Sequence, residues 1–119
     1  MQVMLLFTVV QFQPKCDLYW PDAGSDTYGE VVVTLIREDI LSSYTLRTFS
    51  LRRMKASSGS SSGSGKDGGV PTERTVYQYH FTAWPDHGVP LHALPLITFV
   101  RNSADANPVE GGPIVVHCR

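Results

Sequence analysis

The sequence lacks several features that would define a protein class. It has only two cysteines among 119 residues, a formal net charge of −1, and no apolar run near the ~20 residues that a membrane span needs. The low cysteine content argues against a disulfide-built secreted scaffold. The balanced charge provides no basic surface for nucleic acid. These absences favour a chain from a reducing, cytoplasmic setting, with no membrane contact of its own and no nucleic-acid partner.

Motifs for metal ions and nucleotides are also missing. The four histidines, His80, His87, His92 and His117, show no compact ligand spacing such as His-Glu-x-x-His, and no Cys-x-x-Cys pair is present. The many glycines gather in a Ser/Gly tract, residues 56–72, without an adjoining helix that would make a phosphate-binding loop. The sequence therefore predicts no metal and no cofactor.

The remaining segments predict one α/β unit with a mixed, mainly antiparallel twisted sheet and helical cover. β-branched or alternating runs predict strands at residues 1–12, 30–38, 43–53, 74–81 and 113–117. The last of these is fully apolar, which is typical of a buried strand. An apolar stripe predicts a helix over residues 91–103, where Pro95 fits only near the first turn. Residues 56–72 cannot form a packed core, so they predict a flexible loop between two strands.

Two stretches carry the candidate chemistry. Residues 79–90, YHFTAWPDHGVP, place Asp86 on a turn directly after a strand, between Pro85, which restricts Trp84, and the conformationally free Gly88. Residues 112–118, GPIVVHC, deliver His117 and Cys118 to the tip of the last strand. Each feature alone has a plain structural explanation, since a Trp under a Pro-Asp turn is common and an isolated Cys is most often a small buried side chain.

Together with KCDLYWP at residues 15–21 and YTLRTFSLR at residues 44–52, these stretches resemble the tyrosine-specific protein phosphatases, in the same order along the chain. The wording of residues 78–90 and 93–101 resembles receptor-type members, and within them the branch with carbonic-anhydrase-like ectodomains. The resemblance implies an incomplete phosphatase fold over residues 15–119. It leaves residues 1–14 as an atypical N-terminal strand or a mis-started segment.

The resemblance also implies roles for particular residues. Cys118 would be the nucleophile, Asp86 the general acid and base, and Lys15 a support for Asp86, unless Lys15 is an ordinary solvated lysine. Trp84 and Pro85 would shape the acid loop, and His117 would make structural hydrogen bonds beside the cysteine. The substrates would be phosphotyrosine proteins, and the domain would lie on the cytoplasmic side of a single-pass membrane receptor.

One part of the family pattern is not present in these 119 residues. The family's phosphate-binding loop runs from His-Cys through five residues to an arginine, whereas here Arg119 follows Cys118 directly. Phosphoryl transfer depends mainly on positioning and on charge stabilisation by such groups. We therefore expect residues 1–119 alone to be catalytically incompetent. The alternative function is a non-catalytic interaction module that binds a protein partner through exposed strand edges.

Overall fold

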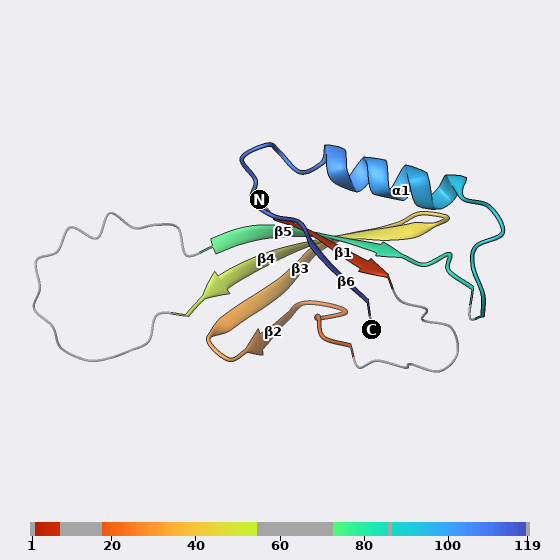
Figure 1. The fold of residues 1–119 in the computed structure, drawn as a ribbon. Helices are drawn as coiled ribbons and strands as arrows, with labels where there is room; N and C mark the ends of the chain where they lie inside the picture. Colours follow the sequence, from red (N-terminus) through yellow and green to blue (C-terminus); the bar gives the residue numbers. More distant parts are fainter. Residues whose placement is uncertain (1, 8–17, 55–72, 86, 119) are drawn as a thin grey trace, which may run out of the picture.

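The computed structural model describes residues 2–7, 18–54, 73–85 and 87–118 (Figure 1); of residues 2–7 and 118 it describes the backbone only. Within these ranges the chain forms six strands and one helix, in this order: β1 Gln2–Phe7, β2 Ser25–Tyr28, β3 Val31–Ile40, β4 Tyr44–Arg53, β5 Glu73–Phe81, α1 Leu94–Asp105 and β6 Val115–Cys118. Strands and a helix therefore lie where they were predicted in the described ranges, with ends shifted by a few residues. Residues 8–12 of the first predicted strand and the predicted loop at residues 56–72 lie outside the described residues. Strand β2 was not predicted, because its four residues are polar and all exposed.

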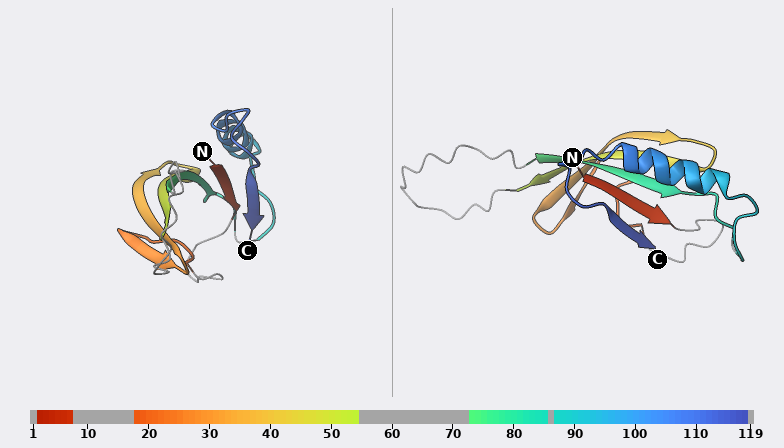
Figure 2. Two further views of the ribbon diagram at one scale, coloured as in Figure 1. Left: turned by 90° about the vertical axis from the view of Figure 1, so that its left-hand side faces the viewer. Right: turned by 45° about the horizontal axis from the view of Figure 1, so that its top comes forward.

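The strands form one mixed sheet in the order β2-β3-β4-β5-β1-β6. The pairs from β2 to β5 are antiparallel, while β1 lies parallel to both β5 and β6. The end-on view in Figure 2 shows a strongly twisted sheet with α1 on one side of it. The predicted class, a mainly antiparallel mixed sheet with helical cover, is confirmed.

The hydrophobic core lies between β5 and α1. Tyr79, Phe81 and Phe99 are its buried members, and the Phe99 ring packs edge-on against Phe81 with ring centroids 5.2 Å apart. The helix begins with Pro95 in its first turn, where the missing N–H costs no hydrogen bond. Only the side of α1 that carries Leu96, Phe99 and Ser103 faces the sheet.

Apolar side chains of α1 and β6 are exposed, and for β6 the prediction of a buried strand was wrong. Leu94, Ile97 and Val100, the other half of the apolar stripe on α1, are exposed, because among the described residues no element covers that side of the helix. In β6, Val115 is 41% and Val116 60% exposed, although the apolar run predicted a buried strand. β6 is the last strand in the sheet order, so its outer edge is unpaired within the part of the chain that the structure describes.

Candidate functional site

Three parallel strands end at the same edge of the sheet. The register places Phe7 of β1 between Phe81 of β5 and Cys118 of β6, so the three strands finish side by side. Two strand spacings separate β5 from β6, about 10 Å. The acid loop begins directly after Phe81, and the segment leading to Lys15 begins after Phe7. The predicted nucleophile therefore lies at the carboxyl end of one of these strands, and the segments with the predicted acid and the supporting lysine begin at the carboxyl ends of the other two. Functional groups often gather at the carboxyl ends of parallel strands.

The loop that carries the predicted acid makes contacts at its start and contains a left-handed glycine beyond residue 86. The Thr82 N–H donates to the carbonyl of Ser43 at 2.9 Å, and Trp84 packs against the core cluster of Tyr79, Phe81 and Phe99. Gly88 has φ of 81°, with no atom within 4 Å of the place where a Cβ would stand. This left-handed backbone is one that glycine adopts readily. Asp86 and Lys15 lie outside the described residues, as does the side chain of Cys118, so their roles stay predictions.

The residue before Cys118, His117, contacts Tyr19. His117 is half-buried at the end of β6, and its Nε2 lies 2.9 Å from the phenol oxygen of Tyr19. The two rings also meet edge to face, with centroids 5.4 Å apart. Tyr19 comes from the KCDLYWP segment, far from His117 in sequence, so this contact ties two of the recognised motifs together.

A polar network on the face of β5 opposite the helix supports Tyr19. The Gln78 amide donates to the Tyr19 oxygen at 3.0 Å, and Arg47 donates to the Gln78 carbonyl oxygen at 2.9 Å and contacts His80 Nδ1 at 3.1 Å. Arg47 also pairs with Glu38 at 2.7 Å. Gln78 and His80 are almost fully buried, and a buried polar group is stable there only when it is hydrogen-bonded.

Aromatic contacts complete this network, which we call the Arg47 cluster: Tyr19, Trp20, Glu38, Arg47, Gln78 and His80. The Arg47 guanidinium lies over the Trp20 ring, 4.9 Å from its centroid, a cation–π contact. Partial burial raises the pKa of Tyr19, while the Gln78 hydrogen bond and the Arg47 charge oppose that rise. The phenol therefore keeps its proton at neutral pH and remains able to donate.

The motif KCDLYWP includes Tyr19 and Trp20, but Arg47, Gln78 and His80 were not predicted to be parts of the site. The available signal was alternation: a strand whose Gln and His fall on one face and whose aromatic residues fall on the other has two different neighbours. An Arg directly opposite Gln78 on the paired strand could not be recognised without the register.

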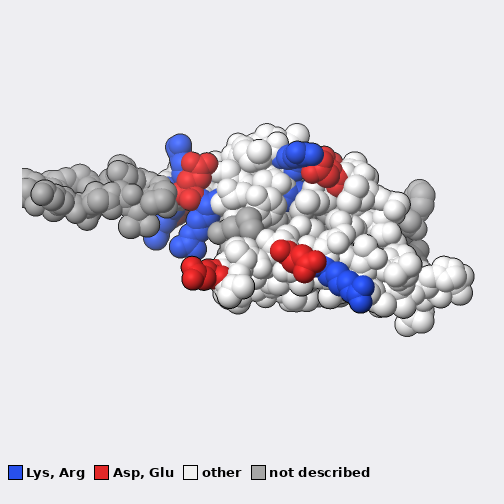
Figure 3. All heavy atoms as spheres, turned by 90° about the horizontal axis from the view of Figure 1, so that it is seen from above, with Lys and Arg blue, Asp and Glu red and all other residues white. Residues whose placement is uncertain are grey.

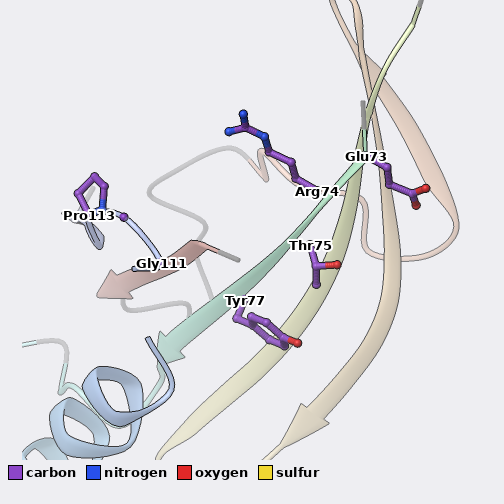
Figure 4. A pocket seen from close by; sticks show the side chains of 7 residues that line it. Glu73, Arg74, Thr75, Tyr77, Gly111 and Pro113 are labelled. Carbon is purple, nitrogen blue, oxygen red and sulfur yellow. The ribbon is translucent and has the colours of Figure 1, made fainter. Parts of the chain in front are cut away.

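A separate hollow lies elsewhere in the structure. A cavity of about 640 Å³ is lined by Glu73, Arg74, Thr75, Tyr77 and residues 111–113. Figure 4 shows it beside the beginning of β5, the end of that strand away from Phe81 and the acid loop. It is therefore separate from the edge where β5, β1 and β6 finish.

The described residues contain no group of His, Cys, Asp and Glu arranged to hold a metal ion. Within the same ranges, no helix is both long and apolar enough to cross a membrane. On the face drawn in Figure 3, basic and acidic side chains lie next to one another rather than gathering by sign.

Comparison with known proteins gives one family. Residues 1–119 match the protein-tyrosine phosphatase family. The chain is 47% identical to the putative receptor-type tyrosine-protein phosphatase mosPTP-1 of Culex quinquefasciatus and to tyrosine-protein phosphatase 99A of Drosophila melanogaster. It is 46% identical to the human receptor-type tyrosine-protein phosphatase zeta. Each match covers 98% of this chain but only 7%, 8% and 5% of those proteins, respectively.

Proposed function

Because this chain belongs to the protein-tyrosine phosphatase family, we propose that its segment carries the nucleophile and the acid of an enzyme that hydrolyses phosphotyrosine in proteins. The observation that supports this best is the common edge at which β5, β1 and β6 end. The loop with Asp86 begins at the end of β5, and Cys118 lies at the end of β6, two strands away. A nucleophile and an acid that act on one substrate need such proximity.

In the proposed reaction the thiolate of Cys118 attacks phosphorus while the bond from phosphorus to the tyrosine oxygen breaks. Asp86 gives its proton to that oxygen, so a neutral phenol leaves. Water then attacks the thiophosphate, Asp86 takes a proton from the water, the S–P bond breaks, and inorganic phosphate is released. No metal or organic cofactor enters either step. Lys15 would hold Asp86 by ion pairing.

We further propose that residues 1–119 alone do not turn over. A thiolate nucleophile of this kind needs donors around the phosphoryl oxygens and a lowered thiol pKa, which backbone N–H groups beyond the cysteine supply. Only Arg119 follows Cys118 in this sequence. A saturable rate of aryl phosphate hydrolysis by residues 1–119, abolished by Cys118→Ser, would contradict this part of the proposal.

A chimera tests the roles of Cys118 and Asp86 in a domain that contains a phosphate-binding loop. Residues 15–118 would replace the matching segment in the catalytic domain of the Drosophila phosphatase 99A, to which the chain is 47% identical. We expect the chimera to hydrolyse a phosphotyrosine peptide and Cys118→Ser to abolish the activity. Asp86→Asn should slow it by about 10²–10⁴-fold, because the leaving oxygen loses its proton donor. The unmodified parent domain is the positive control.

Substrates with different leaving groups test the role of Asp86 further. A good leaving group needs little protonation, so Asp86→Asn should slow phenyl phosphate more than p-nitrophenyl phosphate. Equal slowing of both substrates would contradict an acid role. A folded but inactive chimera beside an active parent would contradict the proposed function as a whole.

A second function is favoured by one observation, the exposed edge of the sheet. The half-exposed valines of β6 and the outer side of β2 could pair with a strand from another protein. Isolated residues 1–119 that elute as a folded complex with a partner, without Cys118-dependent hydrolysis, would favour this interaction module. For the parent protein we propose a cytoplasmic position of this domain in a membrane receptor, supported by the receptor-type names of its relatives.

A further inference from the structure

A chain of hydrogen bonds leads from Arg47 through Gln78 and Tyr19 to His117, and its first two bonds have a fixed direction. A guanidinium has only donors, so the Gln78 atom that faces Arg47 at 2.9 Å must be the carbonyl oxygen. The NH₂ end of the same amide then points the other way and donates to the Tyr19 oxygen at 3.0 Å. The orientation of the amide thus follows from the charge of Arg47.

The same direction continues into His117. The Tyr19 oxygen accepts from Gln78 and lies 2.9 Å from His117 Nε2. When the relay keeps one direction, the phenol O–H donates to that nitrogen. A nitrogen that accepts this proton carries none of its own in the neutral ring, so the ring proton is on Nδ1. We propose that Arg47, Gln78 and Tyr19 form a positioning unit that fixes His117 as the Nδ1–H tautomer.

His80 provides an internal contrast. Arg47 contacts its Nδ1 directly at 3.1 Å, and because arginine can only donate, that nitrogen must be the acceptor. The proton of His80 is then on Nε2. One guanidinium therefore imposes opposite tautomers on two histidines. It acts directly on His80, and it acts on His117 through two intermediate residues, Gln78 and Tyr19.

The unit is anchored well enough to hold this direction. The Arg47 side chain is only 13% exposed and is held by Glu38 at 2.7 Å and by the Trp20 ring. Gln78 is 1% exposed and sits directly opposite Arg47 in the strand register. If this buried amide turned over, its NH₂ group would face the Arg47 guanidinium, which can only donate, so the hydrogen bond to Arg47 would be lost.

The tautomer matters for the residue that follows. Nδ1 is the ring nitrogen nearer the main chain, so the Nδ1–H form presents a donor, rather than a lone pair, towards the backbone that leads into Cys118. A donor is the group that a thiolate requires from its surroundings. This consequence depends on the proposed function, whereas the tautomer itself does not.

Nitrogen-15 NMR of the histidine rings in residues 1–119 tests the proposal. Protonated and bare ring nitrogens have well-separated shifts, and at about pH 8 imidazoles are predominantly neutral. His117→Asn and His80→Asn assign the signals. We expect Nδ1–H at His117 and Nε2–H at His80. Nε2–H at His117 in the folded protein, or an even mixture, would overturn the proposal.

Gln78→Glu reverses the direction of the relay without changing its shape. A carboxylate accepts from both Arg47 and Tyr19, so the phenol proton turns to residue 78 and the phenol oxygen accepts from His117. We expect His117 to change to the Nε2–H form while His80 keeps its tautomer. An unchanged His117 would contradict the relay.

Asn102→Asp is the matched control, because Asn102 also donates an amide N–H to a tyrosine, Tyr44, at 3.2 Å but has no link to His117. It should leave both tautomers as in the wild type. If Gln78→Glu fails to fold, Tyr19→Phe replaces it: loss of the phenol proton should end the bias of His117 towards Nδ1–H. Retention of that form in Tyr19→Phe would also refute the relay.

Discussion

The two faces of β5 place different demands on the same strand. On one face Tyr79 and Phe81 meet Phe99 of α1 in a cluster of aromatic rings. On the other face Gln78 and His80 meet Arg47 and the Tyr19–Trp20 corner through directed hydrogen bonds. The aromatic face stabilises the sheet by burial, which has little directional preference, whereas the polar face fixes the orientation of particular atoms. The aromatic face contributes to the stability of the fold, and the polar face is linked through Tyr19 to His117 at the end of β6.

The largest expected effect is on the aromatic face. Phe99→Ala removes a side chain with 0% exposure that contacts Tyr44, Tyr79 and Phe81, so it should cost about 3–5 kcal/mol of unfolding free energy. Urea denaturation of the variant measures the loss. Val100→Ala on the same helix, 46% exposed, is the control and should cost less than about 1 kcal/mol. Similar costs for the two variants would mean that the core does not lie where we describe it.

The next effect is on the polar face. Arg47→Met keeps much of the volume but removes the donor to Gln78, the contact with His80 and the partner of Glu38, and should cost about 2–3 kcal/mol. Arg37→Met is the matched control, since Arg37 also pairs with a carboxylate, Asp39, but is 72% exposed. It should cost at most about 1 kcal/mol. An Arg47→Met variant as stable as Arg37→Met would remove the distinction between the two faces.

Alkaline pH should weaken both faces through their tyrosines. Burial raises the pKa of Tyr19 and of Tyr79, and for Tyr79 the neighbouring Tyr44 and Tyr77 raise it further. The folded state then keeps these protons after the unfolded chain has lost them, so stability is full below about pH 10 and falls as pH rises above it. Urea midpoints measured across this range should fall less steeply in Tyr19→Phe and in Tyr79→Phe. Unchanged slopes would contradict the raised pKa values.

The smallest effect belongs to an ion pair on neither face. Arg53 contacts Glu30 at 3.2 Å, and both side chains are mostly exposed. Arg53→Ala should change the unfolding free energy by less than about 0.5 kcal/mol, because exposed pairs are screened by water and salt. Thermal denaturation beside the wild type measures this, and a loss comparable to that of Arg47→Met would show that exposure does not rank these ion pairs.

Most of the sheet could be predicted from the sequence because β3, β4 and β5 are long, β-branched or alternating runs. The polar β2 carries no such signal, and it is a strand only because it pairs with β3. The apolar stripe of α1 located the helix, but periodicity could not show which half of the stripe meets the sheet. Phe99 is buried and Ile97 is exposed although both belong to the stripe.

The site divided in the same way. The sequence motifs pointed to Trp84 and Pro85, which come shortly after β5, and to His117 and Cys118, which end β6. Arg47 and Gln78 could not be found, because their roles arise from a cross-strand register and from which face of β5 each side chain occupies. Asp86 and Lys15 lie outside the described residues, and their roles remain to be tested chemically.

The measurement that tests the central claim most directly is the location of the phosphate during turnover. The chimera carrying residues 15–118 would be mixed with a phosphotyrosine peptide, quenched in acid within a single turnover, digested and analysed by mass spectrometry. We expect phosphate bound covalently to the sulfur of Cys118, and none in Cys118→Ser. Turnover without phosphate on Cys118, or with phosphate on another residue, would contradict it.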